Sequence, residues 1–144
     1  MLNQFTILNK RVTNTRTLDS SVLPSTQMNK KVLIIDDEAD IRFLLERGLT
    51  SNNYQVKVAE NLVQGIDKFN HISPDIIVLD VNLPDGNGSH ETHSFRKNSF
   101  KTSIILISAD SDHLIDNYKL LGADAFIKKP FSVNQLIAVI NTLQ

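Results

Sequence analysis

The chain has 144 residues, a formal net charge of −1 at pH 7 and no cysteine. This length is typical of a single domain with a sizeable core. The near balance of charge favours no general attraction to nucleic acid or to an anionic membrane, and the lack of cysteine excludes disulfides and thiolate metal sites. No apolar run approaches the length that spans a bilayer. We therefore expect a soluble, cytoplasmic protein with no direct nucleic-acid binding and no membrane insertion.

Residues 1–29 differ in composition from the rest of the chain. They are rich in Asn, Thr and Ser, contain three basic residues and one acidic residue, and show no helical or strand period. They faintly resemble a transit peptide but lack a clear amphipathic helix, and they contain no apolar signal-peptide core. The composition indicates a disordered N-terminal extension or an upstream start ahead of Met28. We expect the folded domain to comprise residues 30–144.

From residue 30 onward, short apolar runs alternate with helical periods. Strands are expected at residues 32–35, 54–59, 75–79, 104–107 and 125–127. The first, third and fourth runs are apolar throughout, which is typical of parallel strands covered by helices on both faces. The pattern predicts a doubly wound α/β protein, a flavodoxin-like (βα)₅ fold whose five-stranded parallel sheet has the order 2-1-3-4-5.

Apolar residues at helical spacing place three of the helices between and after these strands. They follow the first strand, the second strand and the fifth strand, in that order: Ile41, Leu44, Leu45 and Leu49; Leu62, Ile66 and Phe69; Val133, Leu136, Ile137, Ile140 and Leu143. The third helix should lie at residues 89–98, SHETHSFRKN, where Phe95 is the only large apolar anchor. We expect that helix to be short or loosely packed.

Polar side chains follow the strands at the edge where ligands bind in such sheets. In open parallel sheets this edge lies beyond the carboxyl ends of the strands. The first strand leads into Asp36 and Asp37 and the third into Asp80, while the fourth and fifth lead into Ser108 and Lys129. Three carboxylates, a hydroxyl and an ammonium should therefore share one rim.

Three neighbouring carboxylates repel one another unless a cation joins them. Oxygen ligands favour a hard ion, and Mg²⁺ commonly uses one or two carboxylates, several waters and phosphate oxygens. Such a site suits phosphoryl transfer, in which a carboxylate attacks phosphorus while a metal and a lysine neutralise the oxygens. Asp80 is the candidate nucleophile.

The residues at these strand ends resemble the receiver domain of two-component response regulators, from about Lys30 to Gln144. DDEAD places Asp36 and Asp37 at the acidic pair that binds Mg²⁺ in the family. LDVNLPDGNG resembles the phosphoacceptor loop, which implies that Asp80 is phosphorylated and that the backbone carbonyl of Asn82 is a further metal ligand.

Two later motifs complete the resemblance. LISAD places Ser108 at the hydroxyl that grips the phosphoryl group. GADAFIKKPF places Lys129 at the phosphate-pairing lysine, Pro130 after a peptide bond that is cis in the family, and Phe126 at the switch aromatic. Ser108 and Phe126 are thus the implied switch residues.

The resemblance implies a regulatory phosphoacceptor, with no enzymatic activity beyond self-catalysed phosphotransfer and autodephosphorylation. A sensor histidine kinase or a histidine phosphotransfer protein would supply the phosphoryl group. Asn82 and Asp110 stand where side chains can orient the hydrolytic water, which implies fairly fast self-dephosphorylation. A downstream protein would bind the face formed by the fourth helix, fifth strand and fifth helix, which includes Tyr118, Lys119, Asp124 and Lys128. Because no output domain follows Gln144, we expect a stand-alone receiver.

Each residue also has a simpler structural interpretation when taken alone. Asp37 could cap the first helix with Asp40 as a partner acid, Asp80 could begin a turn, and Lys129 could be a solvated surface lysine. Phe126 could be an ordinary core residue. Only their conjunction at one edge of the sheet favours a phosphoryl site.

Other functions predict different residues. An aspartyl phosphatase needs a second acid two residues after the nucleophile, where Asn82 stands, and a degenerate receiver would act by binding alone. A flavin- or nucleotide-binding domain would meet acidic residues after the first strand, where it needs a phosphate-binding loop. The pair His90 and His93 lacks a nearby third ligand for zinc.

Overall fold

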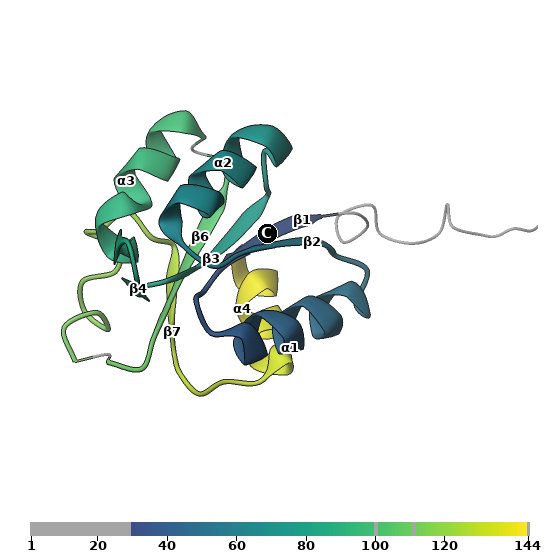
Figure 1. Ribbon diagram of the computed structural model, residues 1–144. Coiled ribbons are helices and arrows are strands. Elements are labelled where there is room, and N and C mark those ends of the chain that lie inside the picture. The colour runs from purple at the N-terminus through teal and green to yellow at the C-terminus, as the bar shows by residue number, and fades with distance from the viewer. Residues whose placement is uncertain (1–29, 100, 111, 144) are drawn as a thin grey trace, which may run out of the picture.

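A computed structural model describes residues 30–99, 101–110 and 112–143 of the chain (Figure 1). The expected disordered extension at residues 1–29 lies outside the described residues. No helix in the described part is long and apolar enough to cross a membrane.

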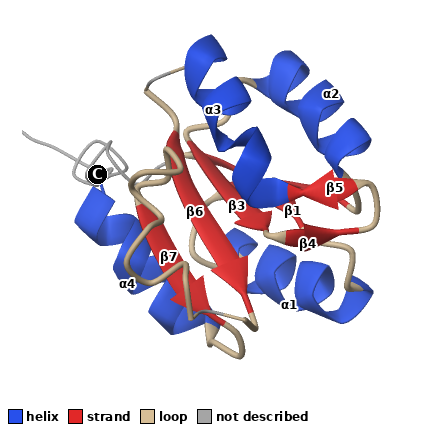
Figure 2. Ribbon diagram, turned by 90° about the vertical axis from the view of Figure 1, so that its left-hand side faces the viewer, coloured by secondary structure: helices blue, strands red, loops and turns tan. Residues whose placement is uncertain are grey.

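Five parallel strands form the central sheet (Figure 2). They are β1 (Lys31–Ile35), β2 (Gln55–Ala59), β3 (Ile76–Asp80), β6 (Ser103–Ser108) and β7 (Ala125–Lys128). Their order across the sheet is β2-β1-β3-β6-β7, so the predicted flavodoxin-like order is confirmed. The register pairs Ile34 with Val78 and Asp80 with Ile107, which brings the carboxyl ends of the central strands to one edge.

Helices cover both faces of the sheet. Figure 1 shows α2 (Leu62–Ile72) and α3 (Gly88–Asn98) on one side and α1 (Ala39–Thr50) and α4 (Val133–Leu143) on the other. Alternate residues of β1 serve the two layers: Leu33 and Ile35 pack beneath α2 and α3, while Val32 and Ile34 pack against α1 and α4. All four side chains are fully buried, as expected for strands in a three-layer fold.

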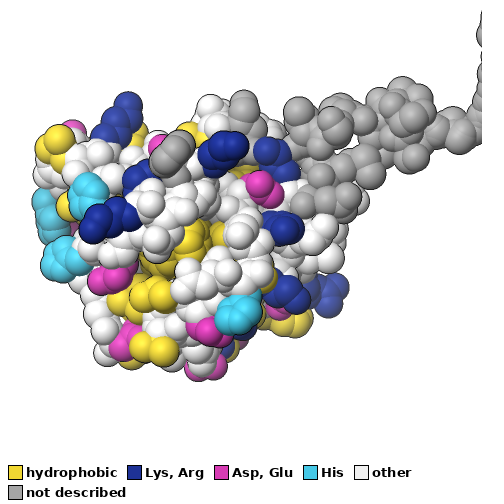
Figure 3. All heavy atoms as spheres, turned by 90° about the horizontal axis from the view of Figure 1, so that it is seen from above, with side chains coloured by type: hydrophobic (Ala, Val, Ile, Leu, Met, Phe, Trp, Pro, Cys, Tyr) yellow, Lys and Arg dark blue, Asp and Glu magenta, His cyan; other side chains and the backbone are white. Residues whose placement is uncertain are grey.

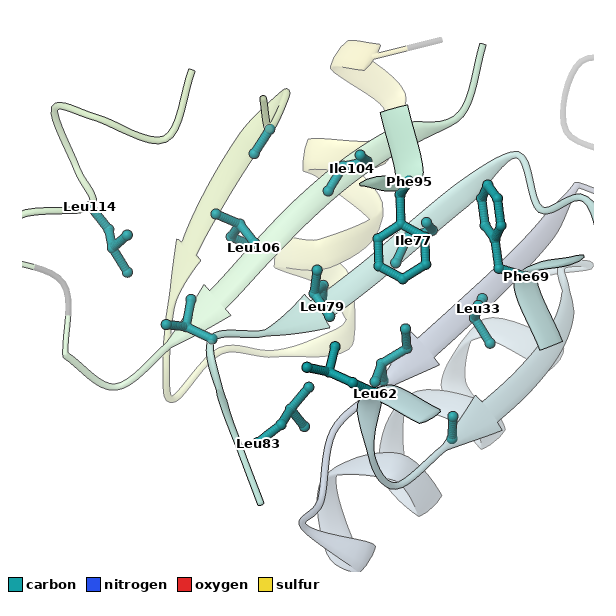
Figure 4. Packing of buried hydrophobic residues seen from close by; sticks show 14 residues of the cluster. Leu33, Leu62, Phe69, Ile77, Leu79, Leu83, Phe95, Ile104, Leu106 and Leu114 are labelled. Carbon is teal, nitrogen blue, oxygen red and sulfur yellow. The ribbon is translucent and has the colours of Figure 1, made fainter. Parts of the chain in front are cut away.

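The third helix has eleven residues, so the expectation that it would be short is wrong. Its apolar anchor Phe95 is 2% exposed and meets Phe69 of α2 edge to face, with ring centroids 5.0 Å apart (Figure 4). Polar contacts supply the rest: Thr92 is fully buried, and the carbonyls of Ser89 and Leu121 both lie within hydrogen-bond distance of its hydroxyl, which can donate its one hydrogen to either. Satisfied buried polar groups thus replace the apolar residues that the sequence lacks.

The described residues between β6 and β7 contain no α-helix, which corrects the expected fourth helix of the (βα)₅ pattern. Residues 112–122 form successive turns whose hydrogen bonds mix spacings: the amide of Tyr118 donates to Leu114, four residues back, and that of Gly122 to Lys119, three back. Only Leu114 is a buried hydrophobic here, while Leu120 is 79% exposed. Tyr118 and Leu121 are only partly buried against the same cluster as Leu114, so the apolar face of this segment is incompletely packed, and most helical stability comes from such a packed face.

A short hairpin follows β3 and holds the start of α2. Its strands are β4 (Asn82–Leu83) and β5 (Gly86–Asn87). Between them, the carboxylate of Asp85 accepts hydrogen bonds from the backbone amides of Leu62 and Val63 at 2.8 and 3.0 Å. These are two of the amides that a helix N-terminus leaves without intrahelical partners. The loop after Asp80 is therefore tied to the neighbouring helix.

Charged side chains do not gather by sign on the α2 and α3 side. Figure 3, which looks down on this side, shows Lys and Arg interspersed with Asp and Glu. This distribution is consistent with the net charge of −1.

Candidate functional site

Three aspartates meet at the carboxyl ends of β1 and β3. Asp36 follows β1 and is fully buried, Asp80 is the last residue of β3 and is 3% exposed, and Asp37 is exposed. Each offers a carboxylate oxygen, and these oxygens lie within 4.8 Å of one another. Among the described residues this is the only group of three or more His, Cys, Asp or Glu that could hold a metal ion, so His90 and His93 form no such group.

Lys129 extends from the end of β7 into this acidic group. Its ammonium nitrogen lies 2.9 Å from Asp36 Oδ2, 2.9 Å from Glu38 Oε1 and 3.1 Å from Asp80 Oδ2. Burial lowers the pKa of Lys129, but the close carboxylates of Asp36 and Glu38 and the charge of Asp80 outweigh burial and raise the pKa above its ordinary value. Lys129 is therefore charged and largely buried, so its simpler interpretation as a solvated surface lysine is wrong.

At Asp80, burial has more effect on the pKa than the favourable contacts do. Burial raises the pKa of its carboxyl group above the ordinary value, and the negative charge of Asp36 raises it further. The backbone amide of Asn82, which donates to Asp80 Oδ1 at 3.1 Å, and the ammonium of Lys129 both lower it, but not enough to cancel these effects. A carboxylate with incompletely balanced charge is the kind of group that a further cation would stabilise.

Asp36 is held in place from several directions. Its Oδ1 accepts the backbone amide of Glu38 at 2.8 Å, and its carbonyl accepts the guanidinium of Arg42 at 2.8 Å. Its other oxygen, Oδ2, is buried and accepts no hydrogen bond of good geometry, although the ammonium of Lys129 lies beside it. A buried carboxylate oxygen without a hydrogen bond fits a site that could take a hard cation.

Asp37 does not cap the first helix. The N-cap residue of α1 is Glu38, whose side chain makes no capping hydrogen bond. The carboxylate of Asp37 instead belongs to the group at the strand ends. The simple capping interpretation of Asp37 is therefore wrong.

Ser108 and Asp110 lie at the end of the neighbouring strand, β6. Ser108 is 1% exposed, and its hydroxyl oxygen accepts the backbone amide of Asp110 at 3.1 Å. Its carbonyl accepts the backbone amide of Lys129 at 2.9 Å, which fixes β7 beside it. The peptide bond between Lys129 and Pro130 is cis, as the resemblance implies.

Phe126 lies on β7, opposite Leu106 of β6, and is partly buried. Its ring packs against the hydrophobic cluster beneath α2 and α3. Tyr118 of the turn segment packs against the same cluster.

Sequence reasoning missed two residues that shape this site. A Cβ at Gly88 would lie 2.1 Å from the carbonyl oxygen of Asp80, so only glycine allows α3 to begin so close to β3. Glu38 contacts Lys129 directly, and its place in DDEAD, immediately after the acidic pair, was the signal available in the sequence.

A surface hollow lies away from this site. A cavity of about 280 Å³ lies at the opposite end of the strands, lined by Lys31, Gln55, Lys57, His71 and Ile72. Contacts within the fold account for three of these residues. The ammonium of Lys31 donates to the carbonyl of Ile72, and the ring of His71 contacts the carbonyl of Asp67. The acidic edge is distinguished by the charged side chains that meet there, and not by the size of a cavity.

Comparison with known proteins gives the same fold and sequence pattern. The transcriptional regulatory protein YxdJ of Bacillus subtilis is 36% identical over 117 residues, which cover 78% of this chain and 49% of that protein. The transcriptional regulatory protein TrcR of Mycobacterium tuberculosis is 34% identical over 110 residues, which cover 75% of this chain and 42% of that protein. This chain thus spans about half the length of these relatives.

Solved structures agree. The beryllofluoride-activated receiver domain dimer of NtrC4 superimposes with a TM-score of 0.74 at 31% identity, covering 79% of this chain and 95% of that one. The family model of the response regulator receiver domain matches residues 32–141. The chain therefore belongs to the receiver domain family of two-component response regulators.

Proposed function

We propose that Asp80 is the phosphoacceptor of this receiver domain and that a partner phosphohistidine is its donor. A carboxylate oxygen of Asp80 attacks phosphorus, the P–N bond breaks, and the imidazole takes up a proton as it leaves. The observation that carries this proposal is the position of Asp80 beside the ammonium of Lys129, which also contacts the buried carboxylate of Asp36. That position provides a nucleophile beside a fixed positive charge.

Receiver domains generally bind Mg²⁺ at an acidic pocket, and the three aspartates here have the donor set for it. We propose that Asp36, Asp37 and Asp80 hold Mg²⁺ together with the backbone carbonyl of Asn82. When bound, the ion would offset negative charge on the phosphoryl oxygens. Without it, the excess of carboxylates would oppose the approach of an anionic donor.

Two further side chains would act on the phosphoryl group itself. The ammonium of Lys129 neutralises charge on an oxygen, as its contact with Asp80 supports. The hydroxyl of Ser108 would leave the amide of Asp110 free and donate to a phosphoryl oxygen. Asn82 and Asp110 would then border the attached group and tune its hydrolysis.

The output would follow from Ser108 and Phe126. A shift of Ser108 toward the phosphoryl group would let Phe126 move and change the face formed by residues 112–122, β7 and α4. Tyr118, Lys119 and Lys128 belong to that face. Asp124, also assigned to it, is engaged inside the molecule in this state, because its carboxylate accepts Arg96 and the amide of Ile104.

A sensor histidine kinase or a histidine phosphotransfer protein is the proposed donor, and a downstream protein is the proposed receiver of the signal. The named relatives are transcriptional regulatory proteins. The NtrC4 receiver forms a dimer in its beryllofluoride-activated state. A second copy of this chain is therefore one candidate for the contact made by the switched face.

The proposal is tested by intact mass after incubation with Mg²⁺ and acetyl phosphate. We expect one added phosphoryl group that is labile to hydroxylamine, and no addition with Asp80→Asn or with Mg²⁺ chelated. Asp85→Asn is the matched control, because Asp85 is an exposed acid on the same loop and should leave the addition intact. If neither an adduct nor beryllium fluoride binding appears, the chain acts by binding alone. Steady turnover of a phosphoester would instead indicate a phosphatase.

A further inference from the structure

Glu38 touches the site without having any of the roles described above. Its Oε1 lies as close to the ammonium of Lys129 as Asp36 Oδ2 does, at 2.9 Å. A lysine ammonium has three N–H donors. Three carboxylates surround it here, from Asp36, Glu38 and Asp80, and those of Glu38 and Asp80 accept its hydrogen bonds. A phosphoryl oxygen that binds Lys129 therefore competes with these neighbours for the ammonium.

The three carboxylates are not equally easy to displace. Asp36 is fully buried and its other oxygen accepts the amide of Glu38, and Asp80 is the group that would carry the phosphoryl. The side chain of Glu38 is 58% exposed and makes no capping bond to the helix it precedes. An exposed ion pair contributes little and exchanges with solvent readily. Glu38 is therefore the partner that Lys129 gives up at least cost.

Glu38 also lies outside the group that could hold a metal, which consists of Asp36, Asp37 and Asp80. The carboxylate of Glu38 contacts Lys129 and is not part of the metal-binding group. Loss of the Glu38 carboxylate should therefore affect Lys129 directly and metal binding only indirectly.

We propose that Glu38 is a positioning residue that holds Lys129 in the resting site and competes with the incoming phosphoryl group for its ammonium. This inference rests on the proposed roles of Asp80 and Lys129. Glu38 then sets how readily the site accepts a phosphoryl group. The ion pair between Glu38 and Lys129 would thus make phosphorylation of the resting site slower.

Three variants separate the contact from the charge. Glu38→Gln removes the charge at equal length, and Glu38→Asp keeps the charge but draws the carboxylate back from Lys129 by one methylene. Glu46→Gln removes the same charge from an exposed position about 12 Å further along α1, given a rise of about 1.5 Å per residue. Thermal unfolding of each variant checks that the fold is retained.

The measurement is the rate of phosphorylation by acetyl phosphate at saturating Mg²⁺, followed by intact mass. We expect Glu38→Gln to raise the rate about two- to fivefold, the range of an ion pair with one exposed partner. Glu38→Asp should raise it as well, and Glu46→Gln should match the parent protein. An unchanged or lower rate in Glu38→Gln would overturn the inference, as would a parent-like rate in Glu38→Asp or an equal rise in Glu46→Gln.

Beryllium fluoride, which mimics the phosphoryl group, gives an equilibrium readout. Its affinity in the presence of Mg²⁺ should rise by a similar factor in Glu38→Gln. If the parent protein accepts neither phosphoryl nor beryllium fluoride, the proposed function fails. If the parent accepts both and the Glu38 variants behave identically to it, only the present inference fails.

Discussion

Lys129 and Arg96 each tie distant segments of the chain together, but the two cations meet different partners. Arg96 of α3 binds one carboxylate, that of Asp124 at 2.6 Å, and donates to the carbonyls of Thr102 and Gly122. Lys129 faces three carboxylates and leaves Asp36 Oδ2 without a hydrogen bond of good geometry. Around Arg96 positive and negative charge balance, whereas around Lys129 negative charge is in excess.

The difference separates a structural network from a reactive one. Asp124 also accepts the amide of Ile104 and so joins α3, the turn segment and β6 with every charge paired. Burial and, after it, the negative charge of Asp36 raise the pKa of Asp80. The excess of negative charge around Lys129 opposes the compact fold, and a bound cation would relieve it. Removing a charge should therefore have opposite effects on stability in the two networks.

The largest effect is expected at Arg96. Arg96→Met keeps an apolar stem but removes the guanidinium, leaving Asp124 and two carbonyls without their donor. We expect a loss of about 2 kcal/mol in the free energy of unfolding, as for charge-assisted hydrogen bonds. Urea denaturation measures it. Lys97→Met, at the neighbouring exposed position, is the control and should change stability little. Equal losses in both variants would contradict a balanced network at Arg96.

A smaller effect of opposite sign is expected at Asp80. Asp80→Asn removes one of the mutually repelling carboxylates, while Lys129 keeps Asp36 and Glu38 as partners. We expect the variant to be about 1 kcal/mol more stable, as is common where a functional residue is relaxed. The same denaturation experiment, in the absence of Mg²⁺, provides the value. A variant less stable than the parent would show that the Asp80 charge stabilises the fold and would remove the contrast with Arg96.

The smallest effect concerns pH. The folded pKa of Asp80 lies above its unfolded value, so the folded state binds more protons between the two pKa values, and stability falls as pH rises through that window. Asp85 has a lowered pKa, chiefly because its carboxylate accepts the amide of Leu62, so its contribution is present above its unfolded pKa and is lost as pH falls through the folded one.

Unfolding free energies from pH 3 to 7 check these opposite signs. Relative to the parent, Asp80→Asn should gain stability as pH rises above about 4, the ordinary aspartate pKa. Asp85→Asn should lose stability relative to the parent as pH rises over the acidic range. Parallel curves for the parent and Asp80→Asn would mean that the carboxyl group of Asp80 titrates alike in the folded and unfolded chain.

Much of the fold was predictable because its signals are local. Uniformly apolar runs at residues 32–35 and 104–107 indicate buried parallel strands, and the rule that carboxyl ends share an edge brings Asp36, Asp80 and Lys129 together without knowledge of any contact. The expected helices were less accurate in detail. Leu44, assigned to the apolar stripe of α1, is 52% exposed, since a spacing rule does not state how wide the buried stripe is.

The errors occurred where polar groups or their absence decide the structure. The third helix was underestimated because Thr92 and Arg96 anchor it through hydrogen bonds to carbonyls distant in sequence. The turn segment at residues 112–122 was expected to be helical because the fold pattern has a helix there, but of its own apolar residues only Leu114 is buried, while Tyr118 and Leu121 are partly buried. Neither outcome follows from the period of apolar residues.

The amino-acid sequence by itself determined where the strands lie along the chain and which residues follow their carboxyl ends, because the apolar runs of buried strands are local patterns. Tertiary structure alone decided that Lys129 is shared among Asp36, Glu38 and Asp80, that Arg96 balances Asp124, and that Gly88 must lack a side chain. Charge balance and close backbone approach depend on distances between segments far apart in the chain, and no spacing rule within a segment contains those distances.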